Sequence, residues 1–132
     1  MLTIDASAAV RAALAQTGFG ELRGQELVAP PLVISESTST LHRLRWTNVL
    51  AADVAGEALA RLLDAPIGIR RPKDLPRTAW EVADELGWAR TYDAEYVALA
   101  RILDCPLLTI DARLARSASR LVQIVRPDEL TP

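Results

Sequence analysis

The chain of 132 residues is half apolar, which is enough to bury a continuous core in one domain, and its formal net charge is −2. That charge excludes a protein that coats nucleic acid through bulk positive charge. The single histidine, His42, excludes a two-histidine acid–base pair, and the single cysteine, Cys105, excludes an internal disulfide. Neither a signal peptide nor an apolar run near the roughly 20 residues of a bilayer span is recognisable. We therefore predict one soluble, cytoplasmic domain over residues 1–132, with no membrane contact.

The first half of the chain alternates short β-rich runs with helical patterns. Residues 1–4 are predicted to form a strand, and an alanine-rich helix follows from Ser7. A second strand is predicted over residues 26–29, where a proline pair stops it. Helices are predicted over residues 32–45 and 50–63. The second of these helices is expected to pack through one apolar face, made of Val54, Ala58, Leu59, Leu62 and Leu63.

The second half repeats this alternation. Its strands are predicted over residues 66–70, 106–110 and 121–125, and its helices over residues 75–86, 92–103 and 112–119. Gly87 is expected to close the first of these helices, and Thr91 to cap the next. Trp80 is expected to face the core from the first of these helices, and Tyr92 and Tyr96, four residues apart, from the next. Strands separated by helices predict an α/β fold, a three-layer α/β/α sandwich around a mostly parallel sheet.

The pentapeptide Leu-Thr-Ile-Asp-Ala occurs twice, at residues 2–6 and 108–112. A duplicated domain is rejected because the residues that follow the two copies do not match. Each copy instead ends a predicted strand with an aspartate, Asp5 or Asp111. Ligands bind outside the carboxyl ends of parallel strands, so both side chains are expected at that edge. Capping of the following helix is the alternative role for each aspartate.

Two further acids are predicted to stand on helices. Glu36 lies among apolar positions near the start of its helix, and a buried lone carboxylate is costly, so it needs a partner. Asp93 opens the 92–103 helix, where complementing the helix dipole is the alternative role.

With these acids in this order, the chain resembles the PIN-domain nucleases, and within them the VapC-type toxins of bacterial toxin–antitoxin pairs. The resemblance spans essentially the whole chain and is carried by Ile4–Ala8, Val28–Leu32 followed by Glu36, Tyr92–Ala100 and Leu107–Leu114. It implies a PIN-like sandwich in which four catalytic acids converge: Asp5, Glu36, Asp93 and Asp111. Ser39 stands where the family frequently has asparagine, which puts a supporting amide contact in doubt. Glu95 is an additional acid and is expected to be solvated.

The resemblance further implies a metal-dependent endoribonuclease that hydrolyses RNA phosphodiester bonds. Mg²⁺, or Mn²⁺, would be held mainly by Asp5 and Asp93 with help from Asp111, and the number of ions is left open. Glu36 would orient water or complete the metal shell, and Thr109 would be a supporting hydroxyl. The ligand type agrees, since Mg²⁺ prefers oxygen ligands. Four crowded carboxylates without a cation should have raised, coupled pKa values.

Arginines are the candidate contacts to RNA phosphates: Arg43, Arg45, Arg113, Arg116 and Arg120. The last three recur at spacings of three and four and are expected on one helix face, and an ordinary solvated face is the alternative. The resemblance implies three partners. They are single-stranded or looped RNA, a VapB-type antitoxin that inserts a basic side chain into the acidic pocket, and a second copy of the chain in a homodimer.

Two other functions are left open by the sequence. An aspartyl phosphotransfer domain would use Asp5 or Asp111 as its nucleophile, but the only lysine, Lys73, lies in a predicted turn rather than at a strand end. A non-catalytic PIN-like RNA-binding or scaffold module is disfavoured because all four acids are present.

Overall fold

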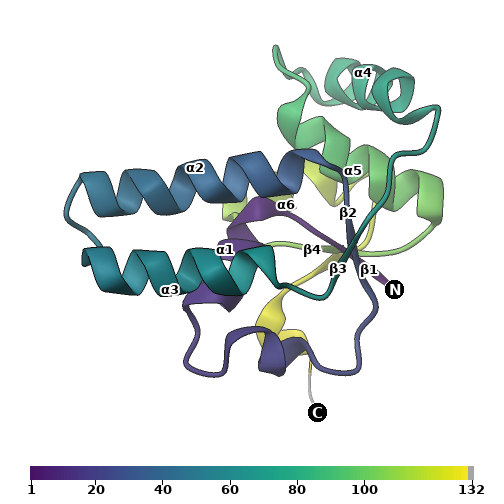
Figure 1. Ribbon diagram of the computed structural model, residues 1–132. Helices are drawn as coiled ribbons and strands as arrows, with labels where there is room; N and C mark the ends of the chain where they lie inside the picture. Colours follow the sequence, from purple (N-terminus) through teal and green to yellow (C-terminus); the bar gives the residue numbers. More distant parts are fainter. Residues whose placement is uncertain (131–132) are drawn as a thin grey trace.

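Five short parallel strands form the centre of the molecule, in the order β3-β2-β1-β4-β5 (Figure 1). They are β1 (Leu2–Ile4), β2 (Leu27–Ala29), β3 (Ile67–Ile69), β4 (Leu107–Leu108) and β5 (Ile124–Val125). The structure is a computed structural model that describes residues 1–130, so the last two residues of the predicted domain lie outside the described residues. The predicted parallel sheet is confirmed, although its strands are shorter than expected, above all the last two.

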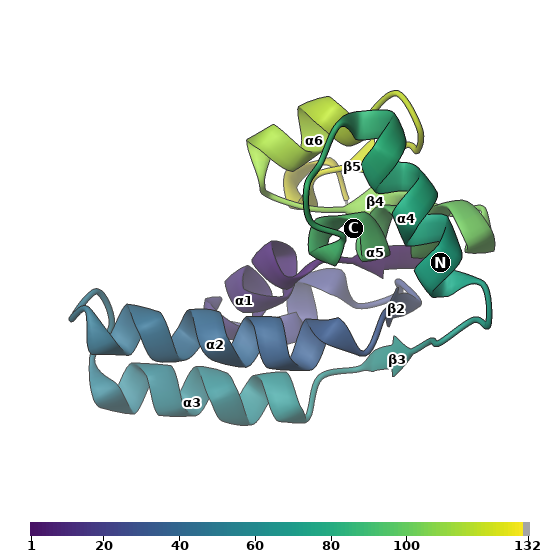
Figure 2. The same ribbon diagram turned by 90° about the horizontal axis from the view of Figure 1, so that it is seen from above.

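Six helices cover the two faces of this sheet (Figure 2). They are α1 (Ala6–Leu14), α2 (Leu32–Trp46), α3 (Ala52–Leu63), α4 (Leu75–Leu86), α5 (Tyr92–Leu103) and α6 (Ala112–Ala118), with short 3₁₀ turns η1 (Gly18–Leu22) and η2 (Pro127–Glu129). The strands step outward from β1 to β3, and the chain then crosses back to β4 and β5. Because parallel crossovers are right-handed, α1 to α3 lie on one face and α4 to α6 on the other. The predicted three-layer sandwich is therefore confirmed.

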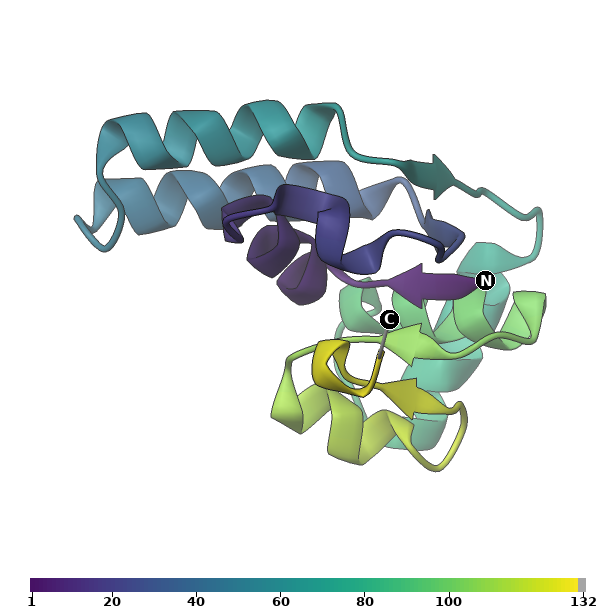
Figure 3. The same cartoon turned by 90° about the horizontal axis from the view of Figure 1, so that it is seen from below.

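The order of the strands reverses beside β1, which has β2 on one side and β4 on the other (Figure 3). Thr3 pairs with Val28 across one edge and with Leu107 across the other. In such sheets the ligand crevice lies at the carboxyl ends of the strands, at the point of reversal. Asp5 follows β1 and Asp111 closely follows β4, so the topology brings both acids to this point.

Helix α5 packs against β1 and β4. Tyr96, Val97 and Leu99 have no exposed surface. Gly87 ends α4 in the left-handed conformation, with φ 70°, as predicted. Thr91 takes the cap position of α5, but its side chain makes no capping hydrogen bond. Within residues 1–130, no helix is both long and apolar enough to cross a membrane.

Several side chains predicted to face the core are exposed instead. Trp80 is 68% exposed because α4 packs through Leu75, Ala79, Val82 and Ala83, and residue 80 lies beside that face. Tyr92 is 57% exposed. Helical side chains lean towards the N-terminus, so this residue, the first of α5, reaches past the end of its helix. On α3 the buried residues are Ala55, Ala58 and Leu62, which leaves the predicted Val54 and Leu63 exposed at the margins.

Candidate active site

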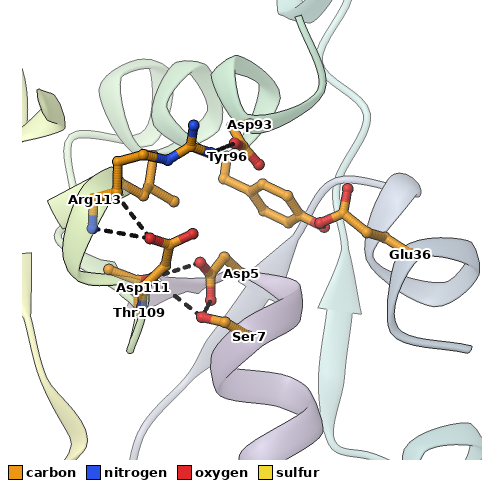
Figure 4. A network of polar contacts seen from close by, with 9 residues as sticks. Asp5, Ser7, Glu36, Asp93, Tyr96, Thr109, Asp111 and Arg113 are labelled. Atoms are coloured by element: carbon orange, nitrogen blue, oxygen red, sulfur yellow. Dashed lines mark hydrogen bonds and ion pairs between the residues drawn. The ribbon is translucent and has the colours of Figure 1, made fainter. Parts of the chain in front are cut away.

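Asp5 lies at the end of β1 and is almost completely buried, with 3% of its surface exposed. Its Oδ1 accepts hydrogen bonds from the backbone N–H of Ala8 at 2.9 Å and from the hydroxyl of Ser7 at 2.7 Å. Its Oδ2 accepts from the hydroxyl of Thr109 at 2.5 Å (Figure 4). The Ala8 contact caps α1, so the alternative role of Asp5 as a helix cap is confirmed. These three donors fix the carboxylate in one orientation.

Thr109 connects Asp5 to Asp111. Its hydroxyl donates to Asp5 and accepts the backbone N–H of Asp111 at 3.0 Å. Asp111 in turn caps α6, because its Oδ1 accepts from the backbone N–H groups of Arg113 and Leu114. The hydrogen bonds between β1 and β4 continue as far as Asp5, whose backbone N–H donates to the carbonyl of Leu108 at 3.2 Å. The Thr109 hydroxyl thus lies beside both strand-end acids, and its supporting role stays a prediction.

Ser7 is a site residue that the sequence analysis treated only as the start of a helix. Its hydroxyl donates to Asp5 and accepts the backbone N–H of Ile110 at 3.2 Å. It thereby ties the turn after β1 to the turn after β4. A serine two residues after a strand-end aspartate was the available signal.

Glu36 lies in the second turn of α2, and its partner is Tyr96. The buried phenol of Tyr96 donates to Glu36 Oε1 at 3.4 Å (Figure 4). Ser39 lies on the exposed side of α2. The sequence analysis placed Tyr96 in the core but did not find this contact. A buried tyrosine, unlike a phenylalanine, needs a partner for its hydroxyl, and that was the available signal.

Asp93 faces Arg113 across the opening of the site. The guanidinium of Arg113 lies 3.8 Å from Asp93 Oδ2, and the two side chains are 79% and 41% exposed. So exposed an ion pair contributes no more than about 1 kcal/mol to stability. Arg113, predicted to contact RNA, therefore stands within the acidic site as a counter-ion.

The other candidate side chains lie further from this centre. Arg116 is on the exposed surface of α6, but Arg120 lies beyond the end of that helix at Ala118, so the expected single face of three arginines is wrong. Arg43 and Arg45 lie in the last turn of α2, about two turns beyond Glu36. Glu95 was expected to be solvated but is partly buried, and burial raises its pKa.

The four acids act on one another electrostatically. Burial raises the pKa of Asp5, against the hydrogen bonds from Thr109, Ala8 and Ser7, and the charge of Asp111 raises it further. Burial, and then the charge of Asp93, raise the pKa of Glu36. Burial, and then the charge of Asp111, raise the pKa of Asp93, while Arg113 lowers it. The expected rise is confirmed for these three groups.

Comparison with known proteins identifies the family. No protein-family model matches the chain. The chain is 37% identical over 116 residues to VapC ribonuclease Mb0985 of Mycobacterium bovis, an alignment that covers 87% of this chain and 89% of that protein. Ribonuclease VapC9 of Mycobacterium tuberculosis aligns with the same identity and coverage. The chain belongs to the VapC ribonuclease family.

A solved structure agrees with the fold. The crystal structure of PAE2754 from Pyrobaculum aerophilum superimposes with a TM-score of 0.73 at 22% sequence identity and covers 96% of this chain and 90% of that one. The PIN-like α/β/α sandwich and the resemblance to VapC-type proteins, both predicted from the sequence, are therefore confirmed.

The acids of this VapC-family chain offer only oxygen ligands. Within residues 1–130, the side chains as they stand form no group of three or more His, Cys, Asp or Glu that could hold a metal ion. Mg²⁺ keeps several of its waters and commonly takes only one or two carboxylates directly, so this spacing is compatible with it. Carboxylates that raise one another's pKa also favour a cation between them. The donor set fits Mg²⁺ in ligand type and in charge.

The raised pKa values predict how the stability of the metal-free protein depends on pH. Above the ordinary values of 3.8 for Asp and 4.5 for Glu, the folded chain binds more protons than the unfolded chain. The free energy of unfolding should therefore fall as pH rises through the raised values. Asp5→Asn cannot ionise at this position and should show a shallower fall as pH rises above the ordinary value of an aspartate. Urea unfolding in the presence of a chelator measures both curves, and parallel curves would contradict the prediction.

A cavity of about 500 Å³ lies against the acids. Its lining includes Glu36, Trp88, Arg90, Tyr92, Asp93 and Arg113. Trp88 and Arg90 come from the loop between α4 and α5, which the sequence analysis did not connect with function. The site of this VapC-family chain is therefore an acidic centre, buried at Asp5, that borders a mixed aromatic and basic cavity.

Proposed function

We propose that this VapC-family chain is a metal-dependent endoribonuclease that hydrolyses RNA phosphodiester bonds as the toxin of a VapB–VapC pair. The observation that carries the proposal is the meeting of Asp5 and Asp111 at adjacent strand ends, joined through Thr109. Glu36 and Asp93 complete the acidic centre from helices on opposite faces of the sheet, and their charges act on each other. The ribonuclease names of the curated relatives support the same activity.

In this proposal each acid is assigned a role that its surroundings support. Asp5 and Asp93 hold the metal with help from Asp111, while Thr109 and Ser7 keep Asp5 in a fixed orientation. Tyr96 holds Glu36, which orients water at the site. When bound, Mg²⁺, or Mn²⁺ in its place, supplies a Lewis acid that activates a water for attack on phosphorus and neutralises charge on the phosphate oxygens.

The charge and exposure of the surface support the proposed partners. Single-stranded or looped RNA can bring a phosphate to the acids, and Arg113, with Arg43, Arg45 and Arg116 further out, offers charge to its backbone. The ion pair between Arg113 and Asp93 supports the idea that a basic side chain of a VapB-type antitoxin fits this pocket. Exposed apolar residues such as Trp46 and Val49 offer surface for a homodimer. A cytoplasmic location stays a prediction.

Metal removal tests the proposal directly. The purified chain should cleave a mixed pool of single-stranded RNA in Mg²⁺ and Mn²⁺, and a chelator should lower the rate to background because the acids alone repel the phosphate. Denaturing gels and sequencing of the cleaved ends measure the reaction. RNA binding without cleavage under every metal condition would favour the scaffold module instead. Covalent labelling of Asp5 or Asp111 by a phosphodonor would favour the phosphotransfer domain.

A further inference from the structure

The cavity beside the acids combines features that a metal site alone does not need. Glu36 and Asp93 contribute one part of its wall, and two aromatic and two basic side chains contribute another, namely Trp88, Tyr92, Arg90 and Arg113. Its volume of about 500 Å³ lies within the range of sites that bind small molecules, about 300–1,000 Å³. The cavity is therefore large enough to take a group next to the one that reacts.

The aromatic part of the wall stands on a fixed loop. Gly87 adopts the left-handed conformation, and its N–H donates to the carbonyl of Asp84 at 3.3 Å. The next residue, Trp88, donates its N–H to the carbonyl of Ala83 at 2.8 Å, and its side chain packs partly against the core. This pair of hydrogen bonds is a Schellman motif, which fixes the path of the chain after α4. Trp88 is thus held in place before any ligand arrives.

Tyr92 has a different environment, although it lines the same cavity. Its side chain is 57% exposed, and it immediately precedes Asp93 at the start of α5. Nothing in the packing of α5 requires an aromatic ring there, whereas Tyr96, one turn later, is completely buried. An exposed ring beside a phosphate-handling site offers a π-face to a base, and stacking of this kind accepts any base.

We propose that this cavity binds one unpaired nucleobase of the RNA substrate, stacked on the ring of Tyr92 with Trp88 as the fixed wall. Arg90 and Arg113 then contact the phosphates on either side of that nucleotide. The inference rests on the proposed ribonuclease function and adds the part of the substrate that the site recognises. A base must leave its helix to stack in this way, so the site selects single-stranded or looped RNA.

Abasic substitution tests the stacking. A single-stranded RNA that the wild type cleaves is prepared as a series in which each base in turn is removed. For the full-length wild type in Mg²⁺, one abasic position near the cut should raise KM about tenfold, with kcat within about twofold. Tyr92→Ala should raise KM for the intact RNA about tenfold, and the same abasic position should then have no further effect.

Two matched variants serve as controls. Tyr92→Phe keeps the ring and should retain the KM of the wild type. Trp80→Ala removes an aromatic side chain that is as exposed but lies outside this cavity, and it should also leave KM unchanged. Circular dichroism establishes that each variant is folded.

The outcomes separate this inference from the proposed function. If the wild type cleaves RNA but Tyr92→Ala has an unchanged KM, the base site is overturned and the ribonuclease stands. If the wild type cleaves no RNA, the proposed function fails. The base site is then tested by the affinity of Asp5→Asn for labelled intact and abasic RNAs. Equal affinity for the intact and all abasic RNAs overturns it. If Tyr92→Ala loses affinity for a VapB-type protein while its RNA kinetics are unchanged, the cavity binds a protein partner, and the base site is again overturned.

Discussion

Replacement of Asp93 by asparagine is expected to lower RNA cleavage by about 10³-fold or more while leaving the protein folded. The side chain is 41% exposed in the first turn of α5, so the isosteric amide fits without strain. It removes one of the two carboxylates expected to hold the metal, and it leaves Arg113 without its partner. Single-turnover cleavage in Mg²⁺ measures the loss, and thermal unfolding followed by circular dichroism measures stability.

Asp104→Asn is the matched control for this variant. Asp104 ends the same helix, is exposed, and has φ 51°, a conformation that asparagine adopts readily. Both variants remove one negative charge from an end of α5, but only Asp93 lies in the acidic site. Asp104→Asn should cleave RNA as the wild type does. Equal losses in both variants, or full activity in Asp93→Asn, would exclude the role assigned to Asp93.

Tyr96→Ala is expected to destabilise the fold by about 3–5 kcal/mol, because it removes a large, fully buried side chain. Tyr92→Ala, one turn earlier on the same helix, should change the free energy of unfolding by no more than about 0.5 kcal/mol, since its ring is largely exposed. Urea unfolding of the metal-free proteins at one pH measures both changes. A similar cost for the two substitutions would contradict the burial that distinguishes them.

Tyr96→Phe separates the hydroxyl of Tyr96 from its ring. It should cost only about 1 kcal/mol, the typical net contribution of one hydrogen bond. The hydrogen bond from Tyr96 lowers the pKa of Glu36, so its loss should raise that pKa further. The acidic limb of the pH–rate profile should therefore move to higher pH. An unchanged profile would show that the phenol does not tune Glu36.

The sequence was sufficient to predict those parts of the site that depend on strand ends. A carboxylate directly after a strand has little freedom, so Asp5 and Asp111 could be placed together from the parallel topology alone. Thr109, which directly follows β4, was implied by the family resemblance. The acids on helices were predicted through the family resemblance, whereas their neighbours were not.

The missed contacts depend on the tertiary packing of helices. Tyr96 meets Glu36 only because α5 and α2 approach the same end of the sheet from opposite faces, which periodicity along one helix does not reveal. Trp80 and Tyr92 matched a helical repeat but lie at the margin and at the end of their buried faces. Arg113 was predicted to contact RNA from the spacing of the arginines in the sequence of α6. Its ion-pair partner, Asp93, belongs to α5, which that spacing does not reveal.

Because β1 pairs with β4, this site can form only after β4 has been synthesised. Residues 3 and 107 are partners in the sheet, and β4 is held on its other edge by β5 at residues 124–125. A growing chain on the ribosome therefore carries Asp5 and Glu36 long before it can bring Asp111 beside them. A fragment that ends before residue 107 contains no such site, and a single proteolytic cut that releases β4 removes it. The strand order thus confines any activity of these acids to a chain that extends through β4 and β5 and is not cut between them and β1.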